Sequence, residues 1–309
     1  MPRDIAQRLT AACRVEHGKD FRLADHPTRH KTDDLNRGDA KKLLQEGVAR
    51  LSELQDRLYA QDRHAVFVMF QAMDAAGKDG AIKHVFTGLN PQGCQVHAFK
   101  APGPVELDMD FMRRHVLRLP SRGMIGIHNR SWYEEVLVVR LHPSILERQK
   151  LPPEVVSPEI WDQRLEDIAA YERYLARQGM VVLKFFLHLS PEEQRSRFLD
   201  RIREPEKNWK LEPSDIAERR HWTAYQEAYE AAIRATAAPH APWYVVPADQ
   251  KWMTRLIVVE AMIEALEGID PHYPKMTEAG LKAMAEARQA LEAETGPVPE
   301  RGSPETRVP

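Results

Sequence analysis

Cysteine is scarce in this chain of 309 residues, and long hydrophobic runs are absent. The two cysteines, Cys13 and Cys94, lie far apart without the spacing of a metal-binding or redox motif, so we expect free thiols in a reducing compartment. No apolar run approaches the roughly 20 residues that a membrane-spanning helix needs. The N-terminus also lacks the apolar core of a signal peptide. We therefore expect a cytoplasmic protein that does not interact with membranes.

An excess of charge of one sign is also lacking. The 44 Lys and Arg residues and the 46 Asp and Glu residues leave a formal net charge of -2 with neutral histidines. This balance gives no general electrostatic basis for binding nucleic acid or an anionic membrane. The histidines form no H-E-x-x-H motif, and no Ser-His-Asp arrangement is apparent. Any basic binding site must therefore be local.

Short apolar runs alternate with segments of helical periodicity along most of the chain. Near-continuous apolar strands separated by helices are typical of a parallel sheet that is covered on both faces. The sequence therefore predicts an α/β fold. The predicted strands are AVFVMF (65–70), QVHAFK (95–100), GMIGIH (123–128), MVVLKFFLHLS (180–190) and PWYVVPA (242–248), and helices are predicted over 39–61, 106–120, 157–179 and 249–266.

The pattern divides the chain into three parts. Residues 1–60 are predicted to form an irregular basic arm followed by a helix, and residues 61–268 to form the core. Residues 269–309 are predicted to be a C-terminal tail that is partly disordered. Within the core, a helix, a break at Pro205–Pro213 and a second helix predict a lid at about residues 195–225.

The segment QAMDAAGKDG, residues 71–80, lacks two residues of the usual phosphate-binding loop. In the pattern G-x-x-x-x-G-K-[ST], Ala72 replaces the first glycine and Asp79 replaces the hydroxyl residue. The Gly-Lys pair nevertheless lies between a buried strand and a helix, where backbone N–H groups and a lysine hold phosphates. The alternative is a solvated turn that happens to contain Gly-Lys. The candidate residues are Asp74 as a magnesium ligand, Lys78 as a catalytic residue, and Ala75, Ala76, Gly77, Asp79 and Gly80 as binding residues.

A second group of polar residues follows the strand at 123–128. Ligand sites in such sheets collect at the carboxyl ends of strands, so Asn129 and Arg130 are expected to face the same crevice as the loop. Arg130 is a candidate phosphate clamp, and Glu134 and Glu135 are candidate ligands for a metal or a nucleoside. The alternative for both glutamates is an exposed acidic pair that the helix dipole favours.

The third group is basic and lies on the predicted lid. Lids that close over phosphates supply arginines that neutralise transition-state charge, whereas Arg195 and Arg203 are better explained as ordinary surface charge. Arg122 is expected at the opposite end of the sheet from the crevice, where a role requires a long substrate or a partner chain. The candidate lid residues are Arg197, Arg201, Lys207 and Lys210.

The segments AMDAAGKDG, HNRSWYEEVLVVRLHP and LSPEEQRSRFLDRIREPEKNWK together resemble the polyphosphate kinase 2 family over roughly residues 30–268. The resemblance implies a three-layer, thymidylate-kinase-like phosphate-loop kinase fold with a five-stranded parallel sheet and a helical lid. It also implies transfer of phosphoryl groups between inorganic polyphosphate and adenine or guanine nucleotides, with magnesium, or manganese as the alternative. Members of the family are commonly dimers or tetramers, so a homodimer or homotetramer is expected.

The resemblance also implies roles for particular residues. Asp74 and Lys78 match the acidic phosphate loop of the family, in which Asp79 is regular. Arg130, Arg197, Arg201, Lys207 and Lys210 match the family's Walker B arginine and basic lid residues. Asn129 departs from the aspartate that is common there, so the second metal would be held by Glu135 or by phosphate oxygens. Asn129 with Glu134 resembles the class III subgroup, in which AMP is accepted as well as ADP.

Two other functions remain open on sequence grounds. An ATP-dependent nucleotide or nucleoside kinase would use the same loop, and the choice of phosphate donor would distinguish it. A non-catalytic phosphate or nucleotide sensor would bind its ligand without transferring a phosphate.

Overall fold

The structure is a computed structural model that describes residues 2–30 and 35–294. The chain divides into two compact units, residues 1–272 and 273–309. In the second unit, α13 (Glu278–Ala293) begins after the N-cap residue Thr277 and has no buried residue. Residues 295–309, which the sequence predicts to be disordered, lie outside the described residues.

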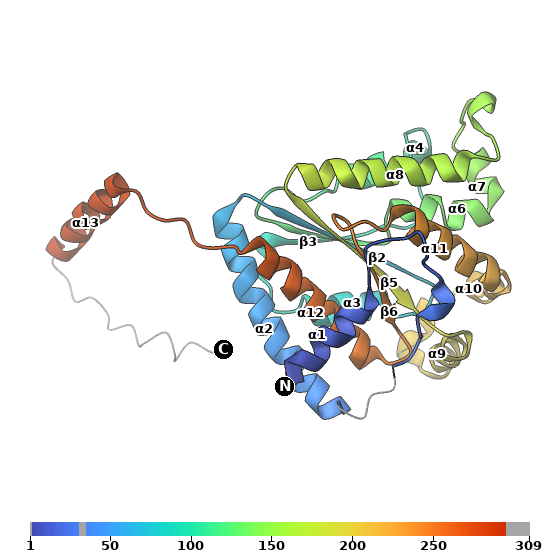
Figure 1. Ribbon diagram of the computed structural model, residues 1–309, viewed down its shortest axis with the longest axis horizontal. Helices are drawn as coiled ribbons and strands as arrows, with labels where there is room; N and C mark the ends of the chain where they lie inside the picture. The colour runs from blue at the N-terminus through green and yellow to red at the C-terminus, as the bar shows by residue number, and fades with distance from the viewer. Residues whose placement is uncertain (1, 31–34, 295–309) are drawn as a thin grey trace. The chain divides into compact units, whose positions relative to one another are not determined.

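A six-stranded sheet forms the centre of the first unit, in the order β1-β6-β5-β2-β4-β3 (Figure 1). Neighbouring strands are parallel except β1, which pairs antiparallel with β6. The five predicted strands are confirmed, but β1 was not predicted because two residues are too few to show a strand pattern. The strands are β1 (Arg14–Val15), β2 (Ala65–Ala72), β3 (Cys94–Ala98), β4 (Ile125–Asn129), β5 (Met180–His188) and β6 (Trp243–Pro247).

Helices cover both faces of this sheet and give the three-layer α/β fold that the sequence predicts (Figure 1). All eight residues of β2 are buried, which explains why this strand is a continuous apolar run in the sequence. One face is covered by α1 (Pro2–Cys13), α2 (Arg37–Gln61), α3 (Lys78–Val85) and α12 (Lys251–Ile269), and the other by α8 (Ile160–Arg177) and α11 (Trp222–Thr236).

The N-terminal segment is not the irregular arm that we expected. α1 packs against α12, and Ala6 and Cys13 of α1 are buried in the core. Arg3 Nε also lies 3.1 Å from the Glu260 carboxylate of α12. Apolar residues recur at helical spacing in α1, but the charged residues between them obscured the pattern.

The prediction of a helix over residues 106–120 is also wrong. The structure has two short helices there, α4 (Pro104–Leu107) and α5 (Arg113–Val116). Between them, the Asp110 side chain accepts a hydrogen bond from Met112 N (3.1 Å). Aspartate side chains that bond to the backbone two residues on form turns that compete with a helix.

The segment between β5 and β6 contains the predicted break between two helices. α9 (Pro191–Arg203) ends before the 3-10 helix η5 (Pro205–Lys210), which α10 (Pro213–Glu218) follows. The remaining elements are α6 (Val138–Leu141), α7 (Pro143–Glu147) and the 3-10 helices η1 (Leu23–Asp25), η2 (Pro91–Gly93), η3 (Trp132–Glu135), η4 (Pro153–Val155) and η6 (Arg219–His221).

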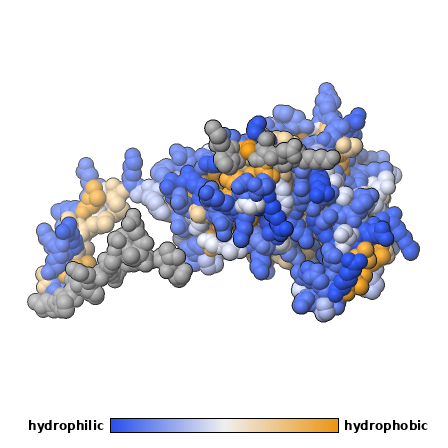
Figure 2. Space-filling view, turned by 90° about the horizontal axis from the view of Figure 1, so that it is seen from below, coloured by the Kyte–Doolittle hydropathy of each residue, from blue (hydrophilic) through white to orange (hydrophobic). Residues whose placement is uncertain are grey.

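The surface is mainly hydrophilic on the face shown in Figure 2, where hydrophobic residues form smaller groups. Cys13 and Cys94 are free thiols, as the sequence predicts, and burial raises the pKa of Cys13 to about 12. Within residues 2–30 and 35–294, no helix is both long and apolar enough to span a bilayer.

Candidate active site

Two neighbouring parallel strands bring the loop and the second group of polar residues together. β2 ends at Ala72, two residues before Asp74, and β4 ends at Asn129, directly before Arg130. Phe70 of β2 pairs with Asn129 of β4. The carboxyl ends of both strands therefore lie at one edge of the sheet, where ligands of such folds bind.

The loop turns sharply between β2 and α3. Ala75 and Gly77 have φ angles of 61° and 104°, and Ala76 N donates to Met73 O (3.3 Å). The left-handed conformation is open to glycine but costs other residues roughly 1–2 kcal/mol, so the strain at Ala75 must be held by surrounding contacts. Gly77 is the N-cap of α3. The free backbone N–H groups at the start of this helix form a site suited to a phosphate.

Lys78 lies at the first position of α3 with its side chain turned back toward the loop. Its Nζ donates to Ala72 O at 2.9 Å. Burial, and secondly the guanidinium of Arg130, lower the pKa of Lys78 to about 8, although the carboxylates of Asp74, Glu134 and Asp79 oppose this shift. The ammonium group therefore stays largely protonated at neutral pH while being held in a partly dehydrated position.

Arg130 connects the loop to η3. Its two terminal nitrogens donate to Glu134 (2.9 Å) and to Asp74 (3.3 Å). Glu134 is held further by buried Gln71, whose amide nitrogen, in the orientation that also satisfies Ser131, lies 2.8 Å from Glu134 Oε1. The structure thus brings Asp74, Arg130 and Glu134 into one charged cluster beside Lys78.

Asn129 contacts the start of α3. Its side-chain Nδ2 donates to Asp79 Oδ1 at 2.7 Å. An amide at position 129 can donate to this carboxylate, whereas a carboxylate there would repel it. Asn129 and Asp79 therefore form a link across the site that needs no cation.

Arg197 of α9 donates hydrogen bonds to the backbone of the loop. Its side chain is 6% exposed, and its guanidinium donates to Ala75 O (3.0 Å) and Ala76 O (2.7 Å). The same group reaches Ala248 O (2.6 Å), and Gln194 Nε2 donates to Asp74 O (2.9 Å). These contacts hold the strained loop. Arg197 is therefore placed to position the loop, and its donors are already engaged by backbone carbonyls and by the Glu193 carboxylate.

The predicted lid residues close one side of the site. A cavity of about 30 Å³ lies between Asp74 and Glu134 on one side and α10 with α11 on the other. Asp215 lines this cavity from α10. Arg219 links η6 to α9, because it donates to Gln194 Oε1 (2.7 Å). This volume is far below the roughly 300–1,000 Å³ of typical ligand pockets.

The other predicted basic residues of the lid are engaged within the lid. Arg201 donates to Lys210 O (3.1 Å) and lies 3.6 Å from the Asp215 carboxylate. Lys207 pairs with Glu204. Lys210 Nζ lies 5.0 Å from the ring centroid of the exposed Trp209.

Two predicted site residues have their contacts outside the loop cluster. The buried carboxylate of Glu135 is bound by Arg164 (3.1 Å) and Gln149 (2.6 Å). Arg122 precedes β4 and donates to Gln178 O (3.4 Å), which precedes β5. Arg122 therefore lies at the amino ends of the strands, opposite the loop, as expected.

The oxygen ligands available for a divalent cation are few. Asp74 is about one-third exposed at the site, and Asp79 lies in the first turn of α3. The described residues contain no group of three or more His, Cys, Asp or Glu side chains that could hold a metal ion. Magnesium is commonly bound through one or two carboxylates together with substrate phosphates and water. The residues present fit that mode of binding.

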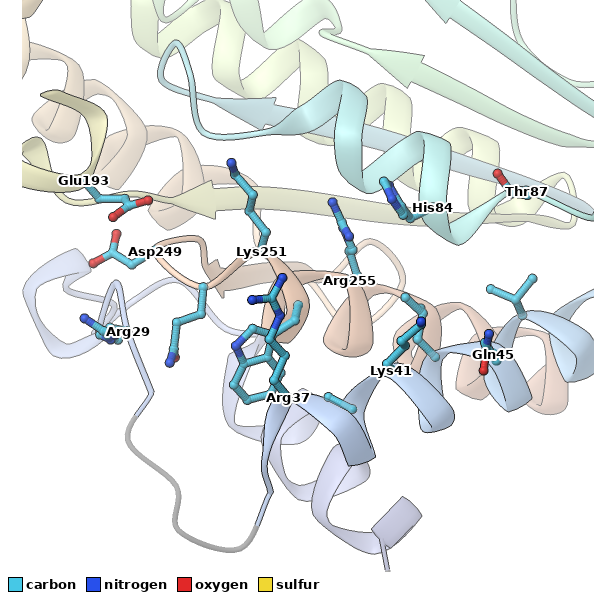
Figure 3. Close-up of a pocket in the computed structure, with 15 residues that line it drawn as sticks. Arg29, Arg37, Lys41, Gln45, His84, Thr87, Glu193, Asp249, Lys251 and Arg255 are labelled. Carbon is cyan, nitrogen blue, oxygen red and sulfur yellow. The ribbon is translucent and has the colours of Figure 1, made fainter. Parts of the chain in front are cut away.

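A basic cleft beside α3 was not predicted from the sequence. It is lined by residues of α2 and α3 and by the start of α12, and its cations include Lys251 and Arg255 (Figure 3). These two residues are one helical turn apart and follow β6. The rule that ligand sites lie after the carboxyl ends of strands could have identified them.

Comparison with known proteins gives consistent matches along the chain. The sequence profile of the family described as Polyphosphate kinase 2 matches residues 34–274. An ADP-polyphosphate phosphotransferase of Rhodopseudomonas palustris is 47% identical over 283 residues, which cover 91% of this chain and 98% of that protein. An AMP/ADP-polyphosphate phosphotransferase of Meiothermus ruber is 44% identical over 237 residues, or 77% and 85% of the two chains. The crystal structure of polyphosphate kinase 2 from Arthrobacter aurescens TC1 superposes with a TM-score of 0.80 at 35% identity, and the match covers 90% of this chain and 96% of that one.

Proposed function

The chain belongs to the polyphosphate kinase 2 family and is a polyphosphate:nucleotide phosphotransferase, and we propose that it uses magnesium to phosphorylate both AMP and ADP. The observation that carries this proposal is the cluster of Lys78, Asp74, Arg130 and Glu134 at the carboxyl ends of β2 and β4. It combines a phosphate-binding helix start with two cations and with oxygen ligands for a metal.

Phosphoryl transfer depends mainly on alignment and charge neutralisation. A terminal oxygen of the nucleotide phosphate attacks the terminal phosphorus of polyphosphate, and the bond to the bridging oxygen breaks, so the shortened chain leaves with the negative charge. Lys78 and the N–H groups at the start of α3 hold the transferred phosphate. Arg130, released from its present carboxylate partners, holds the acceptor phosphate. The attacking oxygen is already anionic, so no general base is required.

Magnesium, when bound, would be held by Asp74 and the phosphate oxygens, and it would neutralise the charge of the phosphates. Asp74 is suited to this because its carboxylate is about one-third exposed and its bond to Arg130 is long, at 3.3 Å. Glu135 is already bound by Arg164 and Gln149. We therefore assign a second cation to phosphate oxygens rather than to Glu135.

The segment between α9 and α11, which contains η5 and α10, must open to admit a nucleotide. The cavity between this segment and the loop has a volume of about 30 Å³, far below the roughly 300–1,000 Å³ of typical ligand pockets. Opening would separate Arg219 from Gln194 and release Asp215 from the site. Closure over bound phosphates would exclude water, which protects the transferred group from hydrolysis.

AMP is proposed as an acceptor because of the residues after β4. Asn129 carries no charge and already binds Asp79. The acceptor side of the site therefore has one carboxylate fewer than it would have with aspartate at position 129. The Meiothermus ruber relative is named an AMP/ADP-polyphosphate phosphotransferase, and this name supports AMP as an acceptor. Glu134 is held at the cavity by Arg130 and Gln71, where it would contact the acceptor.

The test is phosphoryl transfer from polyphosphate with magnesium and without ATP, to AMP and ADP in separate reactions that are analysed by nucleotide chromatography. We expect ADP and then ATP from AMP, and ATP from ADP. Product from ADP alone would refute the AMP part of the proposal. A Glu134→Gln variant should lose more activity with AMP than with ADP, and light scattering would test the homodimer or homotetramer that we also propose.

A further inference from the structure

Gln71 is the one polar side chain of β2, the strand that ends at the loop. The other seven residues of this strand are apolar, and all eight are buried. β2 lies inside the sheet, between β5 and β4 (Figure 1). Burying an amide costs free energy unless its hydrogen-bonding groups find partners. Packing alone would favour an apolar residue here, so the amide of Gln71 requires another explanation.

The partners of this amide lie at the start of η3. The amide oxygen of Gln71 accepts from Ser131 Oγ (3.1 Å) and from Ser131 N (3.2 Å), and its nitrogen donates to Glu134 Oε1 (2.8 Å). A carboxylate only accepts hydrogen bonds, so the nitrogen of the amide faces Glu134. Ser131 is the N-cap of η3, and its hydroxyl also accepts from Tyr133 N (3.4 Å). Gln71 thus holds both the start of η3 and the carboxylate that η3 carries.

Glu134 is held at both of its carboxylate oxygens. Gln71 binds Oε1, and Arg130 binds Oε2 (2.9 Å). In the proposed transfer reaction, Arg130 leaves its carboxylate partners and binds the acceptor phosphate. Gln71 is fully buried in the sheet, so it keeps its place when Arg130 moves. The amide of Gln71 would therefore go on directing the Glu134 carboxylate into the site during transfer.

The position of Glu134 bears on which nucleotide is accepted. Glu134 and Arg130 line the cavity next to Asp74, where the acceptor would bind. A carboxylate accepts hydrogen bonds from hydroxyl groups but repels phosphate. ADP brings one more phosphate to this side of the site than AMP does. A carboxylate that is held in place should therefore favour AMP relative to ADP, and a carboxylate that can turn away should favour it less.

We propose that Gln71 is a positioning residue that sets the choice of acceptor, because its amide holds the Glu134 carboxylate in the site and thereby raises the use of AMP relative to ADP. This inference rests on the proposed function, in which both nucleotides are phosphorylated. Gln71 acts through Glu134 and not on the substrate. An amide suits this role because it donates a hydrogen bond without adding a charge to the cluster of Lys78, Asp74 and Arg130.

The test is Gln71→Met, which keeps a long buried side chain but removes the amide. We would measure kcat/KM with AMP and with ADP, using polyphosphate as the donor. Loss of a hydrogen bond to a carboxylate should lower the ratio of kcat/KM for AMP to that for ADP about tenfold. The change should come mainly from a higher KM for AMP, and KM for polyphosphate should stay the same.

The matched control is Gln55→Met. Gln55 is also fully buried, and its amide oxygen accepts from Asn90 N (3.1 Å) in the segment before β3. This variant loses a buried hydrogen bond that does not involve Glu134. It should unfold at a lower temperature than the wild type and keep the same ratio of AMP to ADP use. An equal fall of the ratio in both variants would overturn the proposal, as would an unchanged ratio in Gln71→Met.

A double-mutant cycle separates positioning from a general structural role. If Gln71 acts through Glu134, Gln71→Met should not lower the ratio further in a protein that already carries Glu134→Gln. A further fall in that background would contradict the proposal. If Gln71→Met did not fold, Ser131→Ala would replace it, because this change removes the hydroxyl that orients the amide. The ratio should fall in Ser131→Ala too, and an unchanged ratio there would also overturn the proposal.

Failure of the proposed function would look different from failure of this inference. A wild type that formed no product from AMP would refute the proposed function, and the inference with it. A wild type that phosphorylates both nucleotides, together with a Gln71→Met variant of unchanged ratio, would refute the inference alone.

Discussion

In the proposed mechanism, the transfer chemistry depends most directly on Lys78. Its ammonium group binds Ala72 O and would exchange this partner for a phosphate. Lys78→Ala removes the charge, and Asp74→Asn weakens the metal ligand. Each change should reduce transfer by at least a hundredfold, about the loss seen when one oxyanion-stabilising donor is removed, while circular dichroism stays unchanged. Near-normal turnover in either variant would contradict the assigned roles.

The lowered pKa of Lys78 predicts a particular pH dependence. Because its pKa is about 8, the free enzyme loses the ammonium charge as the pH rises through that value. The kcat/KM for polyphosphate reports the free enzyme, so it should be constant at neutral pH and should fall above a pH of about 8. A profile that stays flat up to the ordinary lysine pKa would contradict this prediction.

Asn129 offers a test of how the site balances its charges. Asn129→Asp replaces the hydrogen bond to Asp79 with repulsion between two carboxylates. The variant should therefore unfold at a lower temperature than the wild type when a chelator is present, and magnesium should narrow the difference. An isosteric control, Asp79→Asn in the same variant, should remove the repulsion without magnesium.

At the residue level, the sequence predicted which residues lie together at the strand ends better than it predicted their contacts. Lys78, Asp74 and Arg130 follow strand ends and could be identified from chain order alone. That Arg197 binds loop carbonyls and that Glu135 binds Arg164 could not be predicted, because both depend on how α9 and α8 pack against the sheet. The cations of the cleft come from separate segments, so no local pattern unites them.

At the scale of secondary-structure elements, a buried ion pair holds η3 in position. Lys184 of β5 is fully buried and bonds Glu172 of α8 (2.6 Å) and Thr236 O (2.7 Å). Glu172 also accepts from Tyr133 (2.8 Å) and Trp132 (3.4 Å) of η3. This network fixes the segment that carries Glu134, although its members do not touch the substrate site.

Breaking this network should therefore lower the stability of the protein. Lys184→Met leaves the Glu172 charge buried without its partner, which typically costs about 3–5 kcal/mol. Chemical denaturation should show that loss, and adding Glu172→Leu should recover much of it, because it removes the orphaned charge. If the single variant were as stable as the wild type, the ion pair would not hold η3.

The secondary structure could be predicted where the local pattern and the tertiary packing agree. β2, β5 and α2 have long apolar patterns, and their predicted positions are confirmed. The helix expected at 106–120 fails because the turn at Asp110 interrupts it, and hydrophobic periodicity does not detect such turns. β1 forms only by pairing with β6, which is distant in the sequence.

For the whole molecule, the division into two units predicts which part of the chain is needed for activity. All residues of the loop, the lid and the cleft belong to the unit that ends at His272. A chain that ends after His272 should therefore unfold at the same temperature as the full chain and transfer phosphate equally well. Loss of activity with a preserved unfolding temperature would assign a role in transfer to α13.

The choice of phosphate donor tests the central claim most directly. Purified protein would be incubated with ADP, magnesium and long-chain polyphosphate, and in parallel with AMP, magnesium and ATP as the sole donor, and the nucleotides would be separated by chromatography. The phosphate-binding loop at Lys78 and the basic cleft beside α3 predict that ATP forms from ADP with polyphosphate as the only donor. Transfer that occurs from ATP to AMP but never from polyphosphate would contradict the account.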